Sequence, residues 1–200
     1  MGTDIHTYVE RKVDNVWIMV PEEYGPTDPY SGRNRWSLDR SYLLFSILGG
    51  VRGDLDPIIK VRGCPVDISK EVFDSFSSWG KEAHSHSYYL LSELLNGKKL
   101  SYFEEYLVNL AEWKEYKKGN KDLSGIYYGH RCDYNIVSNQ EMDRIESMSV
   151  MLGDNKYATK VNINREYGEI NEYFWETFVP AMQKLDANPD NVRLIFWFDN

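Results

Sequence analysis

The sequence has few cysteines and no excess of basic charge. Its 200 residues include only two cysteines, Cys64 and Cys132, too few and too far apart for a disulfide framework or a Cys-x-x-Cys zinc site. We expect both to be reduced thiols in a cytoplasmic protein. Lysine and arginine number 23 against 31 acidic residues, a formal net charge of −8. That charge opposes broad binding to duplex nucleic acid or anionic membranes, because both need a Lys/Arg-rich surface. It is compatible with a small anionic ligand that a local arginine cluster holds.

Long apolar runs and the best-known catalytic motifs are also missing. No run approaches the roughly 20 residues of a membrane span, and the first residues predict a strand instead of a charged-then-apolar signal. There is no Walker loop, Gly-x-Gly-x-x-Gly, His-Glu-x-x-His or Gly-x-Ser-x-Gly, which removes the readily recognised nucleotide, zinc-protease and esterase classes. We therefore expect a soluble, intracellular protein.

The remaining composition, with 42% hydrophobic and 14% aromatic residues, predicts a packed core. Residues 4–10 alternate as a half-buried strand does, and residues 192–199 are apolar on both faces, as in a central strand. With helices between them, these strands predict an α+β fold: a single domain over residues 1–200, with both terminal strands in one sheet and helices packed on it. The polar segment at about 119–168 predicts only a helix near 139–151.

The other expected elements follow from turn and capping signals. Residues 13–16 predict a hairpin into a strand over 16–20, and residues 21–34 and 54–67 predict loops. Helices are expected over 38–48 (cap Ser37, stop Gly49-Gly50), 69–79 (stop Gly80), 90–95, 101–118 (capping box Ser101-x-x-Glu104) and 171–185 (interrupted at Pro180).

Asp4 and His6 are the first candidate site residues. They lie two apart on the predicted N-terminal strand, so both side chains should face one side of the sheet. That is the geometry of two metal ligands, or of a carboxylate that orients an imidazole. The alternative is structural: Asp4 caps a turn and His6 is a hydrogen-bonded sheet histidine.

His84 and His86 have the same spacing, and they share a face if their segment is extended. Imidazole exchanges protons near neutral pH and is a common ligand of transition metals. A flexible polar loop with two exposed histidines is the alternative.

Asp199 and two arginines complete the candidate site. Asp199 ends an apolar strand, where a carboxylate must be hydrated, paired or coordinated, unless the terminus is simply exposed. Arg52 and Arg62 each precede a glycine, and their guanidinium groups suit phosphate. The alternative for either arginine is a salt bridge, for which the candidates are Asp54, Asp56 and Asp67.

Five segments together resemble a family of short proteins encoded by bacteriophages and prophages, which begin Met-Gly-Cys-Asp-Ile-His and end Phe-Trp-Phe-Asp-Asn. The segments are residues 1–10, 40–52, 62–69, 84–87 followed by 93–95, and 193–200. Thr3 stands where the family usually has cysteine, so this member does not need a thiol there. The resemblance implies a phage or prophage product that works in bacterial cytoplasm, and it implies no particular reaction. By analogy, small phage proteins with Arg-lined pockets include some that sequester or cleave nucleotide signals of bacterial immunity.

The functional hypothesis is a phage-encoded, phosphodiesterase-like hydrolase that acts on a nucleotide or nucleotide signal and counteracts host defence. The expected roles are a divalent metal bound by Asp4, His6, His84 and His86, or acid and base roles divided among these residues and Asp199, with phosphate held by Arg52 and Arg62. Two alternatives stay open: a non-catalytic binding protein that sequesters a nucleotide signal, and a protein-binding inhibitor that needs none of the histidines.

Overall fold

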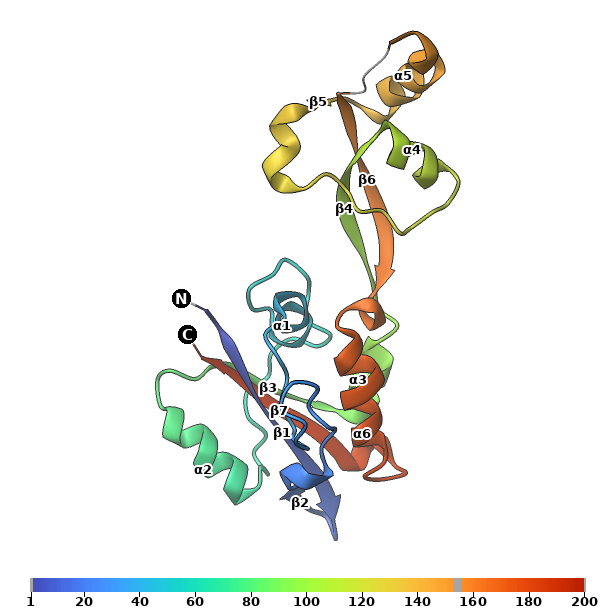
Figure 1. Ribbon diagram of the computed structural model, residues 1–200. Coiled ribbons are helices and arrows are strands. Elements are labelled where there is room, and N and C mark those ends of the chain that lie inside the picture. Colours follow the sequence, from blue (N-terminus) through green and yellow to red (C-terminus); the bar gives the residue numbers. More distant parts are fainter. Residues whose placement is uncertain (1, 153–155, 200) are drawn as a thin grey trace. The chain divides into compact units, whose positions relative to one another are not determined.

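The two terminal strands lie side by side at the centre of a four-stranded sheet. The computed structural model describes residues 2–152 and 156–199, so Met1 and Asn200 of the terminal motifs lie outside the described residues (Figure 1). The sheet has the order β2-β1-β7-β3 with antiparallel neighbours, formed by β2 (Val16–Met19), β1 (Asp4–Val13), β7 (Val192–Asp199) and β3 (His84–Leu90). The predicted α+β class and the shared sheet of the terminal strands are confirmed.

The described chain divides into two compact units. Unit 1 comprises residues 1–100 and 166–200, and unit 2 comprises Ser101–Arg165. The two chain crossings between the units are adjacent, because the Tyr167 N–H donates to the Leu100 carbonyl (2.7 Å). Unit 2 is therefore an insertion into unit 1. This division does not test the expected single domain, which stays a prediction.

Both faces of β7 are covered, which explains why its first seven residues are all buried. On one side, which we call the α2 face, Trp197 packs with Val72 of α2 (Lys70–Trp79). On the other, the α1 face, Phe198 meets Phe45 of α1 (Tyr42–Gly49), with ring centroids 5.2 Å apart. A Cβ added at Gly49 would lie 2.5 Å from the Phe198 ring, so glycine lets α1 approach the sheet. The predicted central strand is confirmed.

Turn chemistry fixes the hairpin between β1 and β2. Asp14 and Asn15 both have positive φ angles, 49° and 64°, as the two central residues of a type I′ turn require. Val13 therefore pairs directly with Val16, as the sequence predicted.

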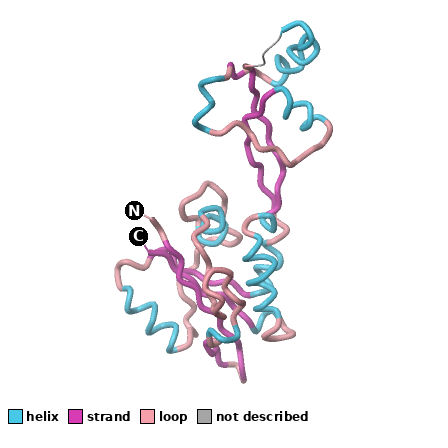
Figure 2. Tube along the Cα trace, in the orientation of Figure 1, coloured by secondary structure: helices cyan, strands magenta, loops and turns pink. Residues whose placement is uncertain are grey.

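Helices α1 and α2 end where expected, but α1 begins later. Gly50 (φ 65°) ends α1, Gly80 (φ 56°) follows α2, and α3 spans Leu91–Gly97. The cap at Ser37 was a wrong prediction, because the chain stays non-helical until Ser41, whose Oγ accepts the Leu44 N–H. Long loops make up much of the rest of the unit (Figure 2).

The last helical segment changes pitch at Pro180. Residues Phe174–Phe178 form a π-helical turn, and α6 (Val179–Gln183) continues from it. Proline has no N–H to donate, so one helical bond is lost and the wider turn absorbs the defect. The predicted interruption is confirmed. The 3-10 turns are Glu22–Tyr24, Tyr128–Asp133, Tyr167–Glu169 and Pro189–Asn191.

Unit 2 has its own sheet, of order β4-β6-β5, and its own core. The elements are β4 (Ser101–Asn109), α4 (Leu110–Lys117), β5 (Asn135–Ile136), α5 (Asn139–Leu152) and β6 (Tyr157–Glu166). The buried cluster includes Val108, Trp113, Met142 and Val161. Across the described residues, none of the helices is long and apolar enough to cross a bilayer.

The predicted helix over 101–118 is half wrong. Residues 101–106 alternate between exposed and half-buried positions and form a strand, so Ser101 and Glu104 make no capping box. The helix starts only after Asn109, whose side chain accepts the N–H groups of Ala111 and Glu112 (both 3.0 Å). Asparagine caps a helix as well as serine does. The helix begins after Asn109 because pairing with β6 keeps the preceding residues extended.

Candidate functional site

The antiparallel register brings Asp4, His6 and Asp199 together at one end of the central sheet. Asp4 lies directly opposite Asp199, and His6 lies opposite Trp197 on the same α2 face. The His6 Nε2 is 3.2 Å from Asp199 Oδ2, and the Asp4 N–H donates to Asp199 Oδ1 (3.2 Å). Three of the predicted site residues therefore converge, although Asp199 lies more than 190 positions from the other two in the sequence.

The contact with Asp199 sets the tautomer of His6. An ionised carboxylate only accepts hydrogen bonds, so a neutral imidazole in this contact carries its proton on Nε2 and has its lone pair on Nδ1. The side chains of His6 and Asp199 keep 26% and 21% of their surface exposed, so solvent reaches the pair. An imidazole oriented by a carboxylate is the usual arrangement of a general base.

Two indole rings hold the His6 imidazole. Trp79, the last residue of α2, lies over it with ring centroids 4.1 Å apart, and Trp197 stacks at 5.7 Å. Trp197 is fully buried, whereas Trp79 is partly exposed. Trp79 is not among the residues predicted for the site, since the sequence marks it only by its position before the helix stop at Gly80.

Arg40 is the second site residue that was not predicted from the sequence. Its Nε and Nη2 both donate to Asp4 Oδ1, at 3.1 and 2.7 Å. A Cβ on Gly2 would lie 2.4 Å from Nη1, so glycine gives the guanidinium room against the strand. The hydrogen bonds that Arg40 donates to Asp4, and then the charges of Asp4 and Asp199, raise the pKa of Arg40. The His6–Asp199 pair thus has a permanent cation beside it.

Arg52 reaches the same end of the sheet, and its backbone is in the left-handed region (φ 62°). Its Nε donates to Oγ1 of the buried Thr3 (2.7 Å), the residue before Asp4. This places one of the two predicted phosphate-binding arginines beside Thr3, at the strand end that also carries Asp4.

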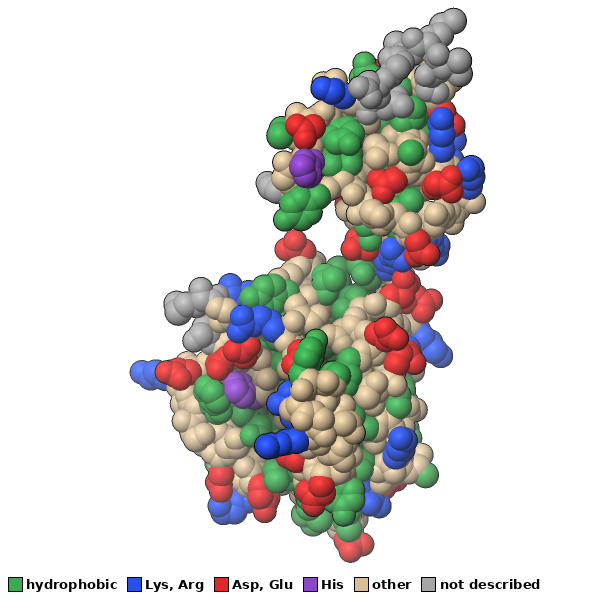
Figure 3. Space-filling view, in the orientation of Figure 1, with side chains coloured by type: hydrophobic (Ala, Val, Ile, Leu, Met, Phe, Trp, Pro, Cys, Tyr) green, Lys and Arg blue, Asp and Glu red, His purple; other side chains and the backbone are tan. Residues whose placement is uncertain are grey.

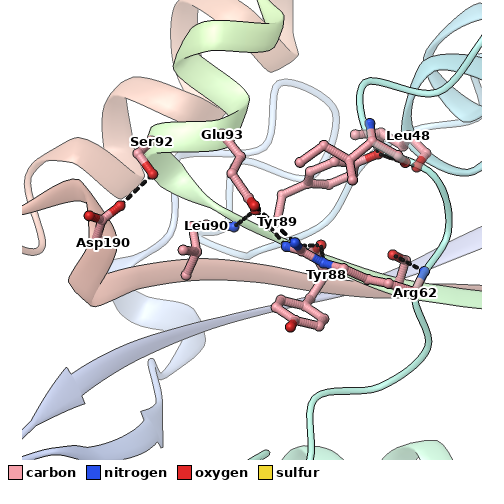
Figure 4. A network of polar contacts seen from close by, with 10 residues as sticks. Leu48, Arg62, Tyr88, Tyr89, Leu90, Ser92, Glu93 and Asp190 are labelled. Carbon is pink, nitrogen blue, oxygen red and sulfur yellow. Dashed lines mark hydrogen bonds and ion pairs between the residues drawn. The ribbon is translucent and has the colours of Figure 1, made fainter.

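Arg62 lies elsewhere and is engaged by its own partners (Figure 4). Its Nη1 and Nη2 donate to the Glu93 carboxylate (2.9 and 2.5 Å), its Nε and Nη2 donate to the Tyr88 carbonyl, and its guanidinium lies 3.8 Å from the centre of the Tyr88 ring. Burial would lower its pKa, but the Glu93 contacts outweigh burial and raise it. Tyr88 pairs with Ile195 on β7, four residues from Asp199, which is roughly 13 Å along a strand. The salt-bridge alternative therefore applies to Arg62, with Glu93 as its partner.

A β-bulge separates His84 from His86. His84 pairs with Phe198 and Ser87 with Phe196, so three steps on β3 span two on β7, and Ser85 takes a positive φ of 48°. The His84 ring stacks on Phe198 on the α1 face, with centroids 6.1 Å apart. His86 instead contacts Phe76 of α2 at 5.0 Å. The prediction that the two histidines share a face is wrong, because the extra residue reverses the alternation.

This arrangement does not bring the predicted metal ligands together. Among the described residues, no three His, Cys, Asp or Glu side chains are placed so that they could hold a metal ion. Asp4 is engaged by Arg40, and Asp199 is shared by His6 and the Asp4 N–H. His84 Nε2 and His86 Nδ1 are buried without a hydrogen-bond partner in the described part of the chain, on opposite faces of the sheet. The residues present do not fit the divalent metal site that the sequence predicted.

Charge on the visible face of the molecule is mixed, with acidic and basic side chains interspersed (Figure 3). This face shows no continuous basic stripe of the kind that duplex nucleic acid requires. Comparisons of the chain with protein families, curated proteins and solved structures give no match.

Proposed function

We propose that the chain is a phosphodiesterase-like hydrolase of a nucleotide or nucleotide signal, with His6 as its acid–base group. The observation that carries this proposal is the partly exposed His6–Asp199 pair, at 3.2 Å, beside the cationic Arg40. We assign Arg52, whose Nε binds Thr3 at the same strand end, as a second cation of the site. Acid–base and cationic groups at one place are what cleavage of a phosphate ester requires.

In the proposed reaction, His6 Nδ1 removes a proton from an attacking water. The water oxygen forms a bond to phosphorus, the bond from phosphorus to the ester oxygen breaks, and the imidazolium returns the proton to that leaving oxygen. Asp199 stabilises the imidazolium at Nε2. Arg40 and Arg52 balance the negative charge that grows on the phosphoryl oxygens. His84, His86 and Arg62 have no part in this scheme.

Two further features support a nucleotide as the substrate. The partly exposed indole of Trp79 offers an aromatic face on which a base can stack. The resemblance to phage and prophage proteins favours a role in bacterial cytoplasm, where a phage gains from removing the nucleotide signals of host defence.

The test is a turnover assay of the full chain on a panel of cyclic and linear nucleotides, in the presence and absence of a chelator. We expect turnover to survive chelation, and His6→Gln to lower kcat by roughly 10²–10⁴-fold, the usual contribution of general acid–base catalysis. His130→Gln is the matched control, because His130 is exposed in unit 2 and contacts Asp133.

Each other outcome has a definite meaning. If a nucleotide binds, depends on Arg40 for binding and is recovered intact after denaturation, the protein sequesters the nucleotide and does not hydrolyse it. Turnover that is lost on chelation and restored by Mg²⁺ or Mn²⁺ would support the metal-dependent mechanism instead. A protein that neither binds nor alters any nucleotide of the panel would refute both nucleotide hypotheses and favour a protein-binding inhibitor.

A further inference from the structure

Unit 2 contains a polar cavity of about 280 Å³ between the end of α4 and strand β6. Its side chains include one aromatic ring, three carboxamides and one ammonium group, from Tyr116, Asn120, Asn162, Asn164 and Lys121. All of them belong to the inserted unit, so the cavity is independent of the His6 site.

The strand geometry presents two carboxamides together. Asn162 and Asn164 are exposed on β6, while Ile163 between them is 2% exposed and belongs to the core. The alternation therefore places both amide side chains on one face. Neither side chain has a hydrogen-bond partner among the described residues. Each offers both donors and an acceptor, the combination that binds a hydroxyl group.

The aromatic ring and the ammonium group come from residues at the edge of the same cavity. The Tyr116 hydroxyl donates to the Asn162 carbonyl (3.4 Å), and its ring stacks on Trp113 with centroids 5.7 Å apart, which fixes the aromatic surface. Lys121 follows Gly119-Asn120 in the loop after α4, and its ammonium has no ionic partner in the described part of the chain. An ammonium group that has no ionic partner among the described residues favours an anionic ligand.

We propose that this cavity binds a small hydroxylated carboxylate of the size of one sugar-acid ring. The volume lies just below the usual range of roughly 300–1,000 Å³ for drug-sized ligands, so a single ring fits better than an oligosaccharide or a dinucleotide. Hydroxyl groups pair with Asn162 and Asn164, the carboxylate pairs with Lys121, and the C–H face of the ring packs on Tyr116. A lone lysine provides one positive charge without the forked geometry of arginine that phosphate prefers, so a monoanion is the better match.

The experiment is an NMR titration of the ¹⁵N-labelled full chain with D-glucuronate and, separately, with D-glucose. Small ligands of this kind bind with millimolar Kd, so about 20 mM glucuronate should approach saturation. We expect shifts concentrated at Lys121, Asn162 and Asn164. Lys121→Gln should weaken glucuronate about tenfold and remove its preference over glucose, because one charge-assisted hydrogen bond is lost.

Two controls keep this proposal falsifiable. Lys160→Gln removes the same charge from β6, but Lys160 pairs with Glu105 (2.9 Å) and does not line the cavity, so binding should be unchanged. Asn162→Ala with Asn164→Ala, both exposed and so compatible with folding, should weaken both sugars. The proposal is overturned if glucuronate leaves these residues unshifted, or if Lys160→Gln weakens binding as much as Lys121→Gln.

Discussion

Replacing Arg193 should destabilise unit 1 strongly, because it leaves a buried carboxylate without its partner. Arg193 lies on the central strand β7 with its side chain 3% exposed, and it binds the fully buried Glu10 of β1 through Nε (2.7 Å) and Nη2 (2.6 Å). Its guanidinium also lies 4.0 Å from the centre of the Trp17 ring. Removal of one member of a buried pair costs roughly 3–5 kcal/mol, so Arg193→Met should lower the free energy of unfolding by about that amount.

A second acidic residue on the same arginine provides the internal comparison. Asp67 accepts from Arg193 Nη1 (2.7 Å), but its side chain is 59% exposed. Burial alone would raise the pKa of Asp67, and the Arg193 contact outweighs burial and lowers it. Because water can replace the lost contact, Asp67→Asn should cost only about 1 kcal/mol or less.

The double variant Glu10→Leu/Arg193→Met decides whether desolvated charge is the cause. It removes both charges, so its cost should fall well below the sum of the single costs, with a coupling of about 2 kcal/mol or more. Urea unfolding followed by tryptophan fluorescence reports mainly on unit 1, since every tryptophan except Trp113 lies there. Additive single costs, or an Asp67→Asn cost equal to that of Arg193→Met, would refute the reasoning.

Three further predictions test local features. The pKa of Asp28 is lowered from 3.8 to about 2, first by the backbone N–H of Ser31, then by the Ser31 side chain and then by Arg35. The stabilisation that the ionised Asp28 provides is therefore present above pH 3.8 and is lost as pH falls toward 2. Asp28→Asn should therefore flatten the stability profile between these values, and an unchanged acid transition would contradict this. Replacing residues 101–165 with a short Gly-Ser linker should leave unit 1 folded, because the Leu100–Tyr167 hydrogen bond already joins the two ends. Circular dichroism and urea unfolding measure this, and loss of a cooperative urea transition would contradict it. Because φ is 48° at the Ser85 bulge, Ser85→Gly should be neutral or stabilising, whereas Ser85→Val should lower the free energy of unfolding by about 1–2 kcal/mol. Urea unfolding measures both, and equal effects would mean that the backbone there is not constrained.

The sequence predicted the central sheet because its signals are local and agree with one another. Alternation in β1, the Asp14-Asn15 turn and the uninterrupted apolar run of β7 each point to the structure that forms. The helix expected from residue 101 failed for the opposite reason. The capping-box pattern at Ser101 favours a helix, whereas pairing with β6, which begins 48 positions after the end of β4, favours a strand, and the pairing determines the structure.

The candidate site shows where spacing arguments stop. The two-residue spacing of Asp4 and His6 placed them correctly because β1 is regular up to the hairpin, while the same spacing failed for His84 and His86 because one residue at positive φ intervenes. Nothing in the sequence marks Ser85 as that residue, since serine is not a typical left-handed residue. Arg40 and Trp79 were missed because their relation to the site exists only in three dimensions: each comes from a different element and meets the strand end through Asp4 or His6. Residue spacing predicts which side chains of one strand share a face. To predict a site that several segments form together, the register between those segments must also be known.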